Sequence, residues 1–163
     1  MKLLKNYEFH GFGFPVIFDS VPGIEVDGEM LPKVDWKKVG YLVVREICQG
    51  QRSALSGNQV KFIRTQLDMS MRDFAKWLGV VHGSVSEWEK KKSKKANMDP
   101  HKEFVLRIKT LLRADEWLRK NSVKHLNLEE VVEGIQWEHL KKVAQPKDRS
   151  TIHLESRYFA NEK

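Results

Sequence analysis

The pattern of apolar and polar positions changes near residue 56 of this 163-residue chain. Within residues 7–47, apolar residues stand in short runs or alternate with polar ones, and turn signals separate the runs. From residue 56 onward they recur every three or four positions. The first spacing is typical of strands and the second of helices. The sequence therefore predicts an α+β fold in which a β-containing N-terminal region precedes an all-helical domain.

Strand signals dominate the N-terminal region. "FPVIF" is rich in β-formers, and "VPGIEVDGEML" carries Pro-Gly and Asp-Gly turn signals between apolar positions. "VGYLVVREI", residues 39–47, predicts either a third strand or a short helix. Pro22, Pro32 and the nearby glycines predict that no long helix forms here. "CQGQRSALSG", which follows, has the composition of a linker.

Two capping signals begin helices in the middle of the chain. Ser56 is followed three positions later by Gln59, and Ser70 by Asp73. In such a pair the first side chain accepts a hydrogen bond from the backbone N–H of the second residue. The apolar residues that follow at helical spacing predict the buried faces, namely Val60, Ile63 and Leu67 in the first helix and Phe74, Trp77 and Leu78 in the second.

A third helix follows after a short turn. Gly79 supplies the left-handed residue that ends the second helix, and Val85 and Trp88 give the third helix its buried face. Two helices joined by so short a turn form a helix-turn-helix. We expect Trp77 and Trp88 to belong to the core and not to act as stacking platforms.

Asp99 and Pro100 predict the start of a fourth helix, as cap and first-turn proline. Its apolar stripe is expected to contain Phe104, Val105, Ile108, Leu111 and Leu112. Helical stretches are also predicted around "LEEVVEGI" and "WEHLKKVA", and the last residues, 147–163, predict a strand or a loose tail. The domain organisation expected is a β-rich region at 1–50, a helix-turn-helix domain at 55–113, and a helical extension with a tail at 114–163.

The positive charge of the chain is confined to its middle third. The formal net charge is +7, and Lys plus Arg outnumber Asp plus Glu by 13 to 6 in residues 56–113. The two counts are equal in residues 1–55, at 7 each, and in residues 114–163, at 9 each. A localised basic excess is expected of a surface that neutralises phosphates. A solvated lysine-rich loop is the alternative interpretation.

Other site classes lack their sequence signals. Cys48 is the only cysteine, which excludes an internal disulfide and a cysteine-based zinc site. The sequence has no nucleophile elbow, phosphate-binding glycine loop or helical pair of metal ligands. Apolar runs are too short to span a bilayer, and the first residues do not read as a signal peptide. We therefore expect a cytoplasmic protein that has no cofactor, is not an enzyme and does not enter a membrane.

Residues 55–90, "LSGNQVKFIRTQLDMSMRDFAKWLGVVHGSVSEWEK", contain several spaced motifs together. They are Leu55-Ser56-Gly57, Phe62-Ile63-Arg64, Phe74-Ala75, Leu78-Gly79-Val80 and Val85-Ser86-Glu87-Trp88-Glu89. With these motifs the segment resembles the helix-turn-helix domain of the Xre and Cro repressor superfamily, and it looks most like MqsA-type and HigA-type antitoxins. The chain departs from that pattern at Met71, where a glutamine is common, and at Val81, where a capping hydroxyl is usual. It also lacks the paired cysteines of the MqsA zinc domain.

The resemblance implies a function. It implies a homodimer that binds a double-stranded DNA operator, represses its own operon and acts as the antitoxin of a type II toxin–antitoxin pair. Residues 1–50, with exposed-looking aromatics at Phe12, Phe14, Phe18 and Trp36, would then bind the cognate toxin. The helix from Asp99 to Arg113 would complete the core and contribute to the dimer, or belong entirely to the core. A stand-alone or phage regulator, and an interaction module that has lost DNA binding, remain as alternatives.

In this architecture the third helix lies in the major groove and the second crosses the backbone. The outward positions that would face bases are His82, Gly83, Ser84, Ser86 and Glu87. His82 can donate to a purine, and Glu87 can accept from a cytosine amino group. The alternatives are an exposed polar residue at His82 and an ion pair from Glu87 to Lys90 or Lys91. The phosphate contacts would come from Arg72, Lys90, Lys91, Lys92, Lys94 and Lys95.

Overall fold

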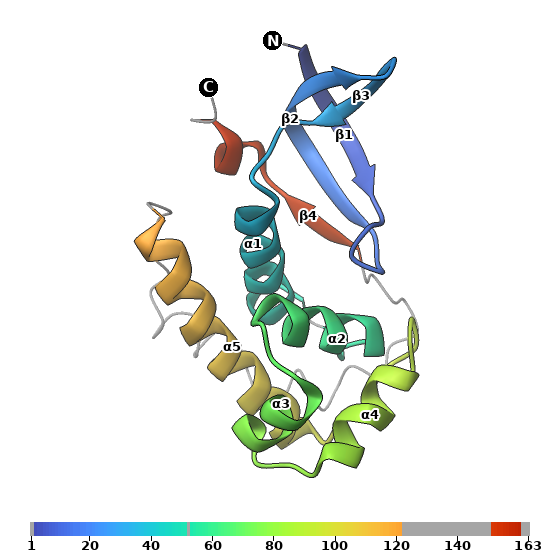
Figure 1. The fold of residues 1–163 in the computed structure, drawn as a ribbon, viewed down its shortest axis with the longest axis vertical. Coiled ribbons are helices and arrows are strands. Elements are labelled where there is room, and N and C mark those ends of the chain that lie inside the picture. Colours follow the sequence, from blue (N-terminus) through green and yellow to red (C-terminus); the bar gives the residue numbers. More distant parts are fainter. Residues whose placement is uncertain (1, 52, 122–150, 161–163) are drawn as a thin grey trace.

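The computed structural model describes residues 2–51, 53–121 and 151–160, and its elements are shown in Figure 1. They are β1 (Lys2–Phe9), β2 (Val16–Val26), β3 (Glu29–Pro32), α1 (Trp36–Gln49), α2 (Gly57–Gln66), α3 (Met71–Leu78), α4 (His82–Lys90), α5 (Pro100–Lys120), β4 (Ile152–Leu154) and a 3₁₀ helix, η1 (Ser156–Phe159). Three N-terminal strands precede five helices, and a C-terminal strand joins the sheet. The predicted α+β class is thereby confirmed.

β2 is the central strand of the sheet. β1 pairs with it antiparallel from Val16 to Gly23, β3 pairs antiparallel with its far end, and β4 pairs parallel with Val16–Phe18. The Asp-Gly signal is confirmed as a turn, because Asp27 and Gly28 both have positive φ, 50° and 84°. Two such residues between antiparallel strands are typical of a type I′ hairpin turn. Of the two outcomes predicted for the C-terminal residues, a strand forms at 152–154.

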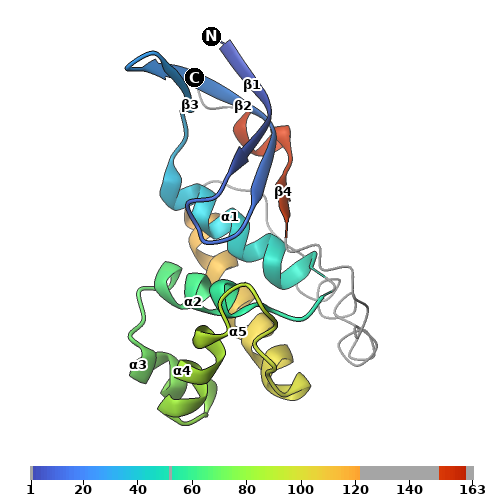
Figure 2. The same ribbon diagram turned by 90° about the vertical axis from the view of Figure 1, so that its right-hand side faces the viewer.

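The expectation that no long helix lies within residues 7–47 is wrong. α1 contains 14 residues and begins after Asp35, whose carboxylate accepts hydrogen bonds from the backbone N–H groups of Lys37 and Lys38 at 2.9 and 3.2 Å. Pro32 does not interrupt this helix because it precedes the cap. The helix packs between α5 and the sheet, so its many β-branched residues are buried on several sides (Figure 2). Burial on both sides outweighs their weak helix propensity.

The aromatic residues of the N-terminal region are mostly not exposed. Phe14 and Phe18 belong to the core, Phe12 packs partly against it, and Trp36 alone of the four is 40% exposed. The Phe12 and Phe14 rings lie 4.7 and 5.3 Å from the ring of Phe62 on α2. The β1–β2 turn is thereby packed onto the helices, and the strands and helices share one hydrophobic core.

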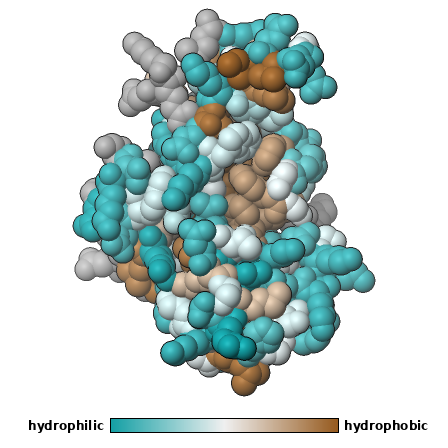
Figure 3. All heavy atoms as spheres, viewed as in Figure 1, coloured by the Kyte–Doolittle hydropathy of each residue, from teal (hydrophilic) through white to brown (hydrophobic). Residues whose placement is uncertain are grey.

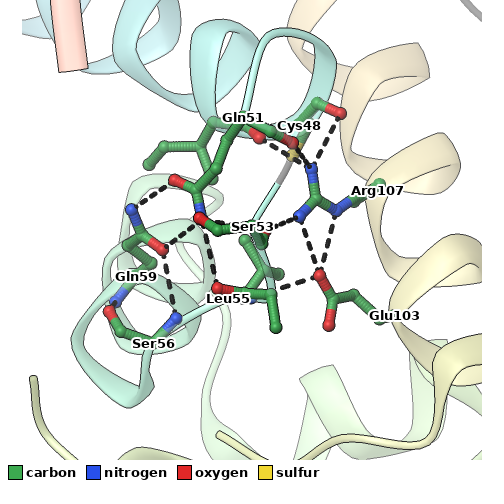
Figure 4. A network of polar contacts seen from close by, with 10 residues as sticks. Cys48, Gln51, Ser53, Leu55, Ser56, Gln59, Glu103 and Arg107 are labelled. Atoms are coloured by element: carbon green, nitrogen blue, oxygen red, sulfur yellow. Dashed lines mark hydrogen bonds and ion pairs between the residues drawn. The ribbon is translucent and has the colours of Figure 1, made fainter. Parts of the chain in front are cut away.

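The stretch expected to be a linker is held by a buried arginine. Arg107 on α5 is 2% exposed and donates hydrogen bonds to the backbone carbonyls of Ile47, Gln51 and Ser53 at 3.1, 2.7 and 2.7 Å (Figure 4). Its guanidinium also pairs with Glu103 at 2.7 Å. The linker prediction is therefore wrong in two respects, since α1 continues to Gln49 and the carbonyls after it are fixed to α5.

The start of α5 is confirmed, and its predicted stripe is partly wrong. Asp99 accepts hydrogen bonds from the backbone of His101 and Lys102, and Pro100 is the first helical residue. Of the predicted stripe, Leu111 is buried, whereas Val105 and Leu112 are 39% and 49% exposed. The buried face of α5 instead includes Leu106, Arg107, Thr110, Ala114 and Leu118. The helix continues through Lys120, across the boundary predicted at 113/114.

Two sequence expectations lie outside this description. The helical stretches predicted at residues 128–135 and 137–144 fall outside the described residues. Among the helices that the structure describes, none combines the length and apolarity needed to cross a membrane.

Candidate DNA-binding surface

The predicted helix-turn-helix forms from α3, a short turn and α4. Ser70 caps α3 by accepting from the backbone N–H of Asp73 at 3.1 Å. Gly79 ends the helix in the left-handed conformation at φ 69°, and the next residue, Val80, donates its N–H to Ala75 at 2.9 Å. The positive φ explains why glycine stands here. Val85 and Trp88 of α4 then turn into the core, as predicted.

The predicted base-reading residues lie on the outer side of α4. His82, Gly83 and Glu87 are exposed, and Ser84 and Ser86 are half-buried. A Cβ added at Gly83 would meet nothing within 4 Å, so the backbone is open to solvent at this position. Arg72, in the first turn of α3, is exposed as well. The start of α4 and the start of α3 thus both present accessible polar side chains.

The N-terminus of α4 has no side-chain cap. Val81 occupies the cap position with extended backbone. Its apolar side chain has no acceptor atom, so it makes no capping hydrogen bond. Its side chain is 72% exposed, the largest exposed fraction among the large apolar residues described. An exposed apolar side chain and a helix start without a side-chain cap suit a DNA groove, where methyl groups and phosphate oxygens are available.

Glu87 makes the ion pair that the sequence offered as its alternative role. Its carboxylate lies 3.0 Å from the ammonium of Lys90, and both side chains are about two-thirds exposed. Exposed pairs of this kind contribute roughly 0–1 kcal/mol. Glu87 can therefore leave Lys90 at little cost to the fold when another partner is offered.

A buried ion pair that sequence reasoning did not identify holds α4 in place. Arg64 on α2 forms two hydrogen bonds with the carboxylate of Glu89, at 2.6 and 3.1 Å, and a third with the carbonyl of Met69, at 2.8 Å. Both side chains are largely buried. Two hydrogen bonds between one guanidinium and one carboxylate fix the relative orientation of the two side chains as well as their distance. Both residues stand in the motifs quoted above, but sequence spacing alone gives no sign of their contact.

The predicted phosphate-contacting lysines follow α4 on an ordered segment. Lys90, Lys91, Lys92 and Lys94 are exposed, and Lys95 is half-buried. The backbone of this segment is fixed to the start of α2, because the carbonyls of Lys92 and Lys94 accept from the N–H groups of Asn58 and Gly57 at 2.8 and 3.1 Å. The backbone of the lysine run therefore caps α2, and the side chains of Lys90, Lys91, Lys92 and Lys94 are exposed.

Gly57 makes this close approach possible. A Cβ at this position would lie 2.4 Å from the carbonyl oxygen of Trp88 and 2.7 Å from the backbone nitrogen of Lys92. Both contacts are with backbone, which cannot rotate away. Glycine is thus required where the end of α4 meets the start of α2.

The β1–β2 turn lies beside the start of α2. The side-chain amide of Asn58 donates to the carbonyl of Gly13 at 2.9 Å, while its backbone N–H donates to Lys92. One residue of α2 therefore connects the sheet to the lysine run. The position of the cations is set by both parts of the fold.

Trp77 differs from the expectation of a core residue, whereas Trp88 meets it. Trp88 is buried, but Trp77 is half-buried. The Lys109 ammonium and the Arg113 guanidinium lie 4.8 and 6.0 Å from the centre of its ring, and Lys109 also donates to the Trp77 carbonyl. The indole is thereby covered by cations of α5, an arrangement that fixes α3 on α5.

The described residues form no candidate metal site, and comparisons with known proteins found no match. Within residues 2–51, 53–121 and 151–160, no three His, Cys, Asp or Glu side chains come together in a way that could hold a metal ion. No protein-family model, curated protein or solved structure matches the chain.

Proposed function

We propose that this protein is a sequence-specific DNA-binding repressor that acts as a homodimer. The observation that carries the proposal is the combination of an accessible α4 with an ordered lysine run directly after it. In a helix-turn-helix of this form the second helix enters the major groove. Lysines that directly follow this helix would contact phosphates of the DNA backbone and so fix the helix in the groove.

Each part of the surface has a distinct role in the proposal. His82, Ser84 and Glu87 read base edges, since each can donate to or accept from the groups in the major groove. Gly83 keeps the helix start free of bulk, so the backbone can approach the DNA closely. Arg72 and the lysines contact phosphates and carry no sequence information.

The proposal includes the antitoxin role that the resemblance implies. A cytoplasmic antitoxin would repress its own operon and neutralise a toxin bound outside the DNA-binding helices. The matching gene arrangement is a short neighbouring reading frame for a small protein that arrests growth when expressed alone. Growth restored by co-expression of this chain supports the role, and growth arrest unchanged by co-expression contradicts it.

The dimer contact is proposed for α5. Val105 and Leu112 are exposed and stand seven positions apart, on one face of the helix. Sedimentation of the wild type and of a Val105→Ser/Leu112→Ser variant tests this contact. A dimer that persists in the variant contradicts it.

A second function is favoured by one observation. Glu87 already has a partner in Lys90, and a carboxylate that stays paired presents no base-reading group. A helix-turn-helix of this kind would serve as a protein-interaction module that has lost DNA binding. The two functions differ in whether the chain discriminates between DNA sequences.

A gel-shift titration at stated salt concentrations decides between them. The repressor should bind a fragment from upstream of its gene roughly 10³-fold more tightly than a scrambled fragment. His82→Ala and Glu87→Ala should each reduce that preference by about 1–3 kcal/mol while non-specific binding persists. Equal affinity of the wild type for both fragments at every salt concentration contradicts the repressor at that operator.

The lysine run has its own test. Replacing Lys90, Lys91 and Lys92 by alanine should weaken binding to every DNA sequence and reduce the salt slope by about 0.9 for each lost phosphate contact. The matched control is the triple alanine variant of Lys2, Lys5 and Lys33, which removes equal charge from exposed positions at the sheet. A salt slope that changes equally in both variants places the lysines outside the interface.

A further inference from the structure

The outer end of the sheet exposes a set of aliphatic side chains on one face. Leu3 is paired with Pro22, and Ile24 is paired with Leu31, so these residues share a face with Val26, two positions along β2. The exposed fractions of Leu3, Ile24, Val26 and Leu31 are 56%, 45%, 43% and 37%. We call these four residues the hairpin patch.

The opposite face of the same strands already packs against the protein. Val21 is fully buried and Leu4 packs against the core. Leu4 and Met30 lie over Gly23, where a Cβ would come within 3.0 and 2.8 Å of them. Both faces of the outer end of the sheet therefore carry apolar side chains. In an antiparallel sheet with one solvated face, that face is normally polar.

Figure 3 shows brown, apolar surface at the end of the molecule that the sheet forms. Exposed aliphatic side chains that gather on one face are a feature of interaction sites. The four side chains are only partly buried, so packing within the fold does not account for all of their apolar surface. They remain available to a partner.

The charge of the hairpin indicates which kind of partner fits. Residues 19–32 contain Asp19, Glu25, Asp27 and Glu29 and no Lys or Arg, in a chain whose net charge is +7. Glu29 is paired with Val26 and so lies on the face of the hairpin patch, and Asp27 occupies the adjoining turn. Lys5, paired with Ser20, lies on the same face beyond Leu3, away from this turn. Two copies placed hairpin to hairpin would bring these carboxylates together, whereas cations would complement them.

The patch also lies far from the DNA-binding surface. Both views place the β2–β3 hairpin at one end of the molecule and α4 at the other (Figures 1 and 2). A partner on the hairpin would leave α4 and the lysine run uncovered. Binding of such a partner is compatible with binding of DNA.

We propose that the hairpin patch binds a protein segment with an aliphatic or aromatic surface bordered by lysine or arginine. The apolar side chains of the partner cover Leu3, Ile24, Val26 and Leu31, and its cations pair with Asp27 and Glu29. This inference deepens the proposed antitoxin function, because it assigns the partner a chemistry and a place, and it rests on that function for the existence of a cellular partner.

The experiment uses a phage-displayed library of random peptides, selected on the full chain. Peptides that also bind an Ile24→Ser/Leu31→Ser variant are first removed. The expected result is enrichment of peptides that combine apolar residues with Lys or Arg. An enriched synthetic peptide should bind the double serine variant at least about tenfold more weakly, given the apolar area lost. It should also bind an Asp27→Asn/Glu29→Gln variant more weakly, and wild type more weakly in high salt.

Two controls test whether the loss of peptide affinity is specific to the hairpin patch. Val81→Ser removes an exposed apolar side chain at the other end of the molecule and should leave peptide affinity unchanged. Gel shifts on the same preparations should show equal DNA affinity for wild type and the double serine variant. Loss of DNA binding in the wild type would contradict the repressor proposal while leaving the peptide result standing.

Three outcomes overturn the inference. The first is a selection that yields no peptides dependent on Ile24 and Leu31. The second is enrichment of peptides without Lys or Arg, whose affinity does not respond to salt. The third is a wild-type dimer that dissociates in the double serine variant, which would show that a second copy covers the patch.

Discussion

The two ends of this molecule use polar and apolar side chains in opposite ways. At the helical end, charged groups are buried and paired, as in Arg64 with Glu89 and Arg107 with Glu103. At the sheet end, aliphatic groups such as Ile24 and Leu31 are exposed. Buried pairs fix the geometry of the helices, and exposed aliphatics contribute little to it. A substitution should therefore affect stability at the first end and binding at the second.

The same contrast occurs within one helix. Glu87 and Glu89 stand two positions apart on α4 and so lie on different sides of it. Glu89 is buried against Arg64, whereas Glu87 is paired with Lys90 in solvent. Identical chemistry thus serves the fold at one position and is available to DNA at the other.

The largest effect is expected from breaking the inner pair. Arg64→Met leaves the carboxylate of Glu89 buried without its partner and should lower the free energy of unfolding by about 3–5 kcal/mol. Urea unfolding of the variant measures this loss. The cost comes from the unpaired charge, not from the loss of an attraction in itself.

Two further variants test that reason. Arg64→Met/Glu89→Met removes both charges and should recover most of the lost stability. Lys90→Met, which breaks the exposed pair with Glu87, should change stability by about 1 kcal/mol or less. If Arg64→Met and Lys90→Met lowered the free energy of unfolding by similar amounts, the distinction between the two sides of α4 would be wrong.

Two glycines near α4 should respond to alanine with opposite signs. Gly57→Ala places a Cβ against the backbone of Trp88 and Lys92 and should destabilise the protein by about 1–3 kcal/mol. Gly83→Ala meets open space in a helix and should stabilise it by up to about 1 kcal/mol. Thermal unfolding measures both. A stable Gly57→Ala variant with unchanged DNA affinity would show that the lysine run is not held by this approach.

Cys48 provides a pH-dependent effect at the helical end. Burial raises the pKa of its thiol to about 12 from an ordinary 9.0, although nearby Arg107 acts to lower it. Above pH 9 the thiol of the unfolded chain ionises first, so stability falls as the pH rises toward 12. One such proton lowers the unfolding free energy by at most about 1.4 kcal/mol per pH unit.

The measurement compares unfolding of wild type and Cys48→Ala between pH 8 and pH 11. Tyr41 also has a raised pKa because of burial, so both proteins lose stability in alkali. The wild type should lose more, and the difference isolates the thiol. Parallel curves would show that Cys48 ionises in the folded protein as readily as in the unfolded chain.

Local signals predicted the helical end well. The capping box at Ser56 forms with Gln59, Ser70 caps α3, Gly79 adopts positive φ, and Asp99 caps α5. Each signal acts within four residues, so the sequence alone contains the whole interaction. The exposure of His82, Gly83 and Glu87 on α4 followed from the same spacing, whereas Ser84 and Ser86 are half-buried.

Distant contacts account for what the sequence did not predict. α1 contains a β-branched run that favours a strand locally, and its burial between α5 and the sheet overrides that preference. Arg107 is buried on α5, where its partners are carbonyls more than fifty residues away, and Val105 and Leu112 lie outside the buried face. The pairing of Arg64 with Glu89 likewise depends on the fold.

The smallest stability effect is expected at the sheet end. Ile24 and Leu31 are directly opposed across β2 and β3 and are largely exposed, so they stabilise each other by only about 0.2–1 kcal/mol. Ile24→Ser/Leu31→Ser should therefore lower the unfolding free energy by about 1 kcal/mol or less. Leu106→Ala on α5, where the side chain is fully buried, should cost about 2–5 kcal/mol. Urea titrations of the two variants compare the ends directly. A loss at the hairpin as large as that at Leu106 would mean that the hairpin patch belongs to the core of the folded protein and is not a surface kept for a partner.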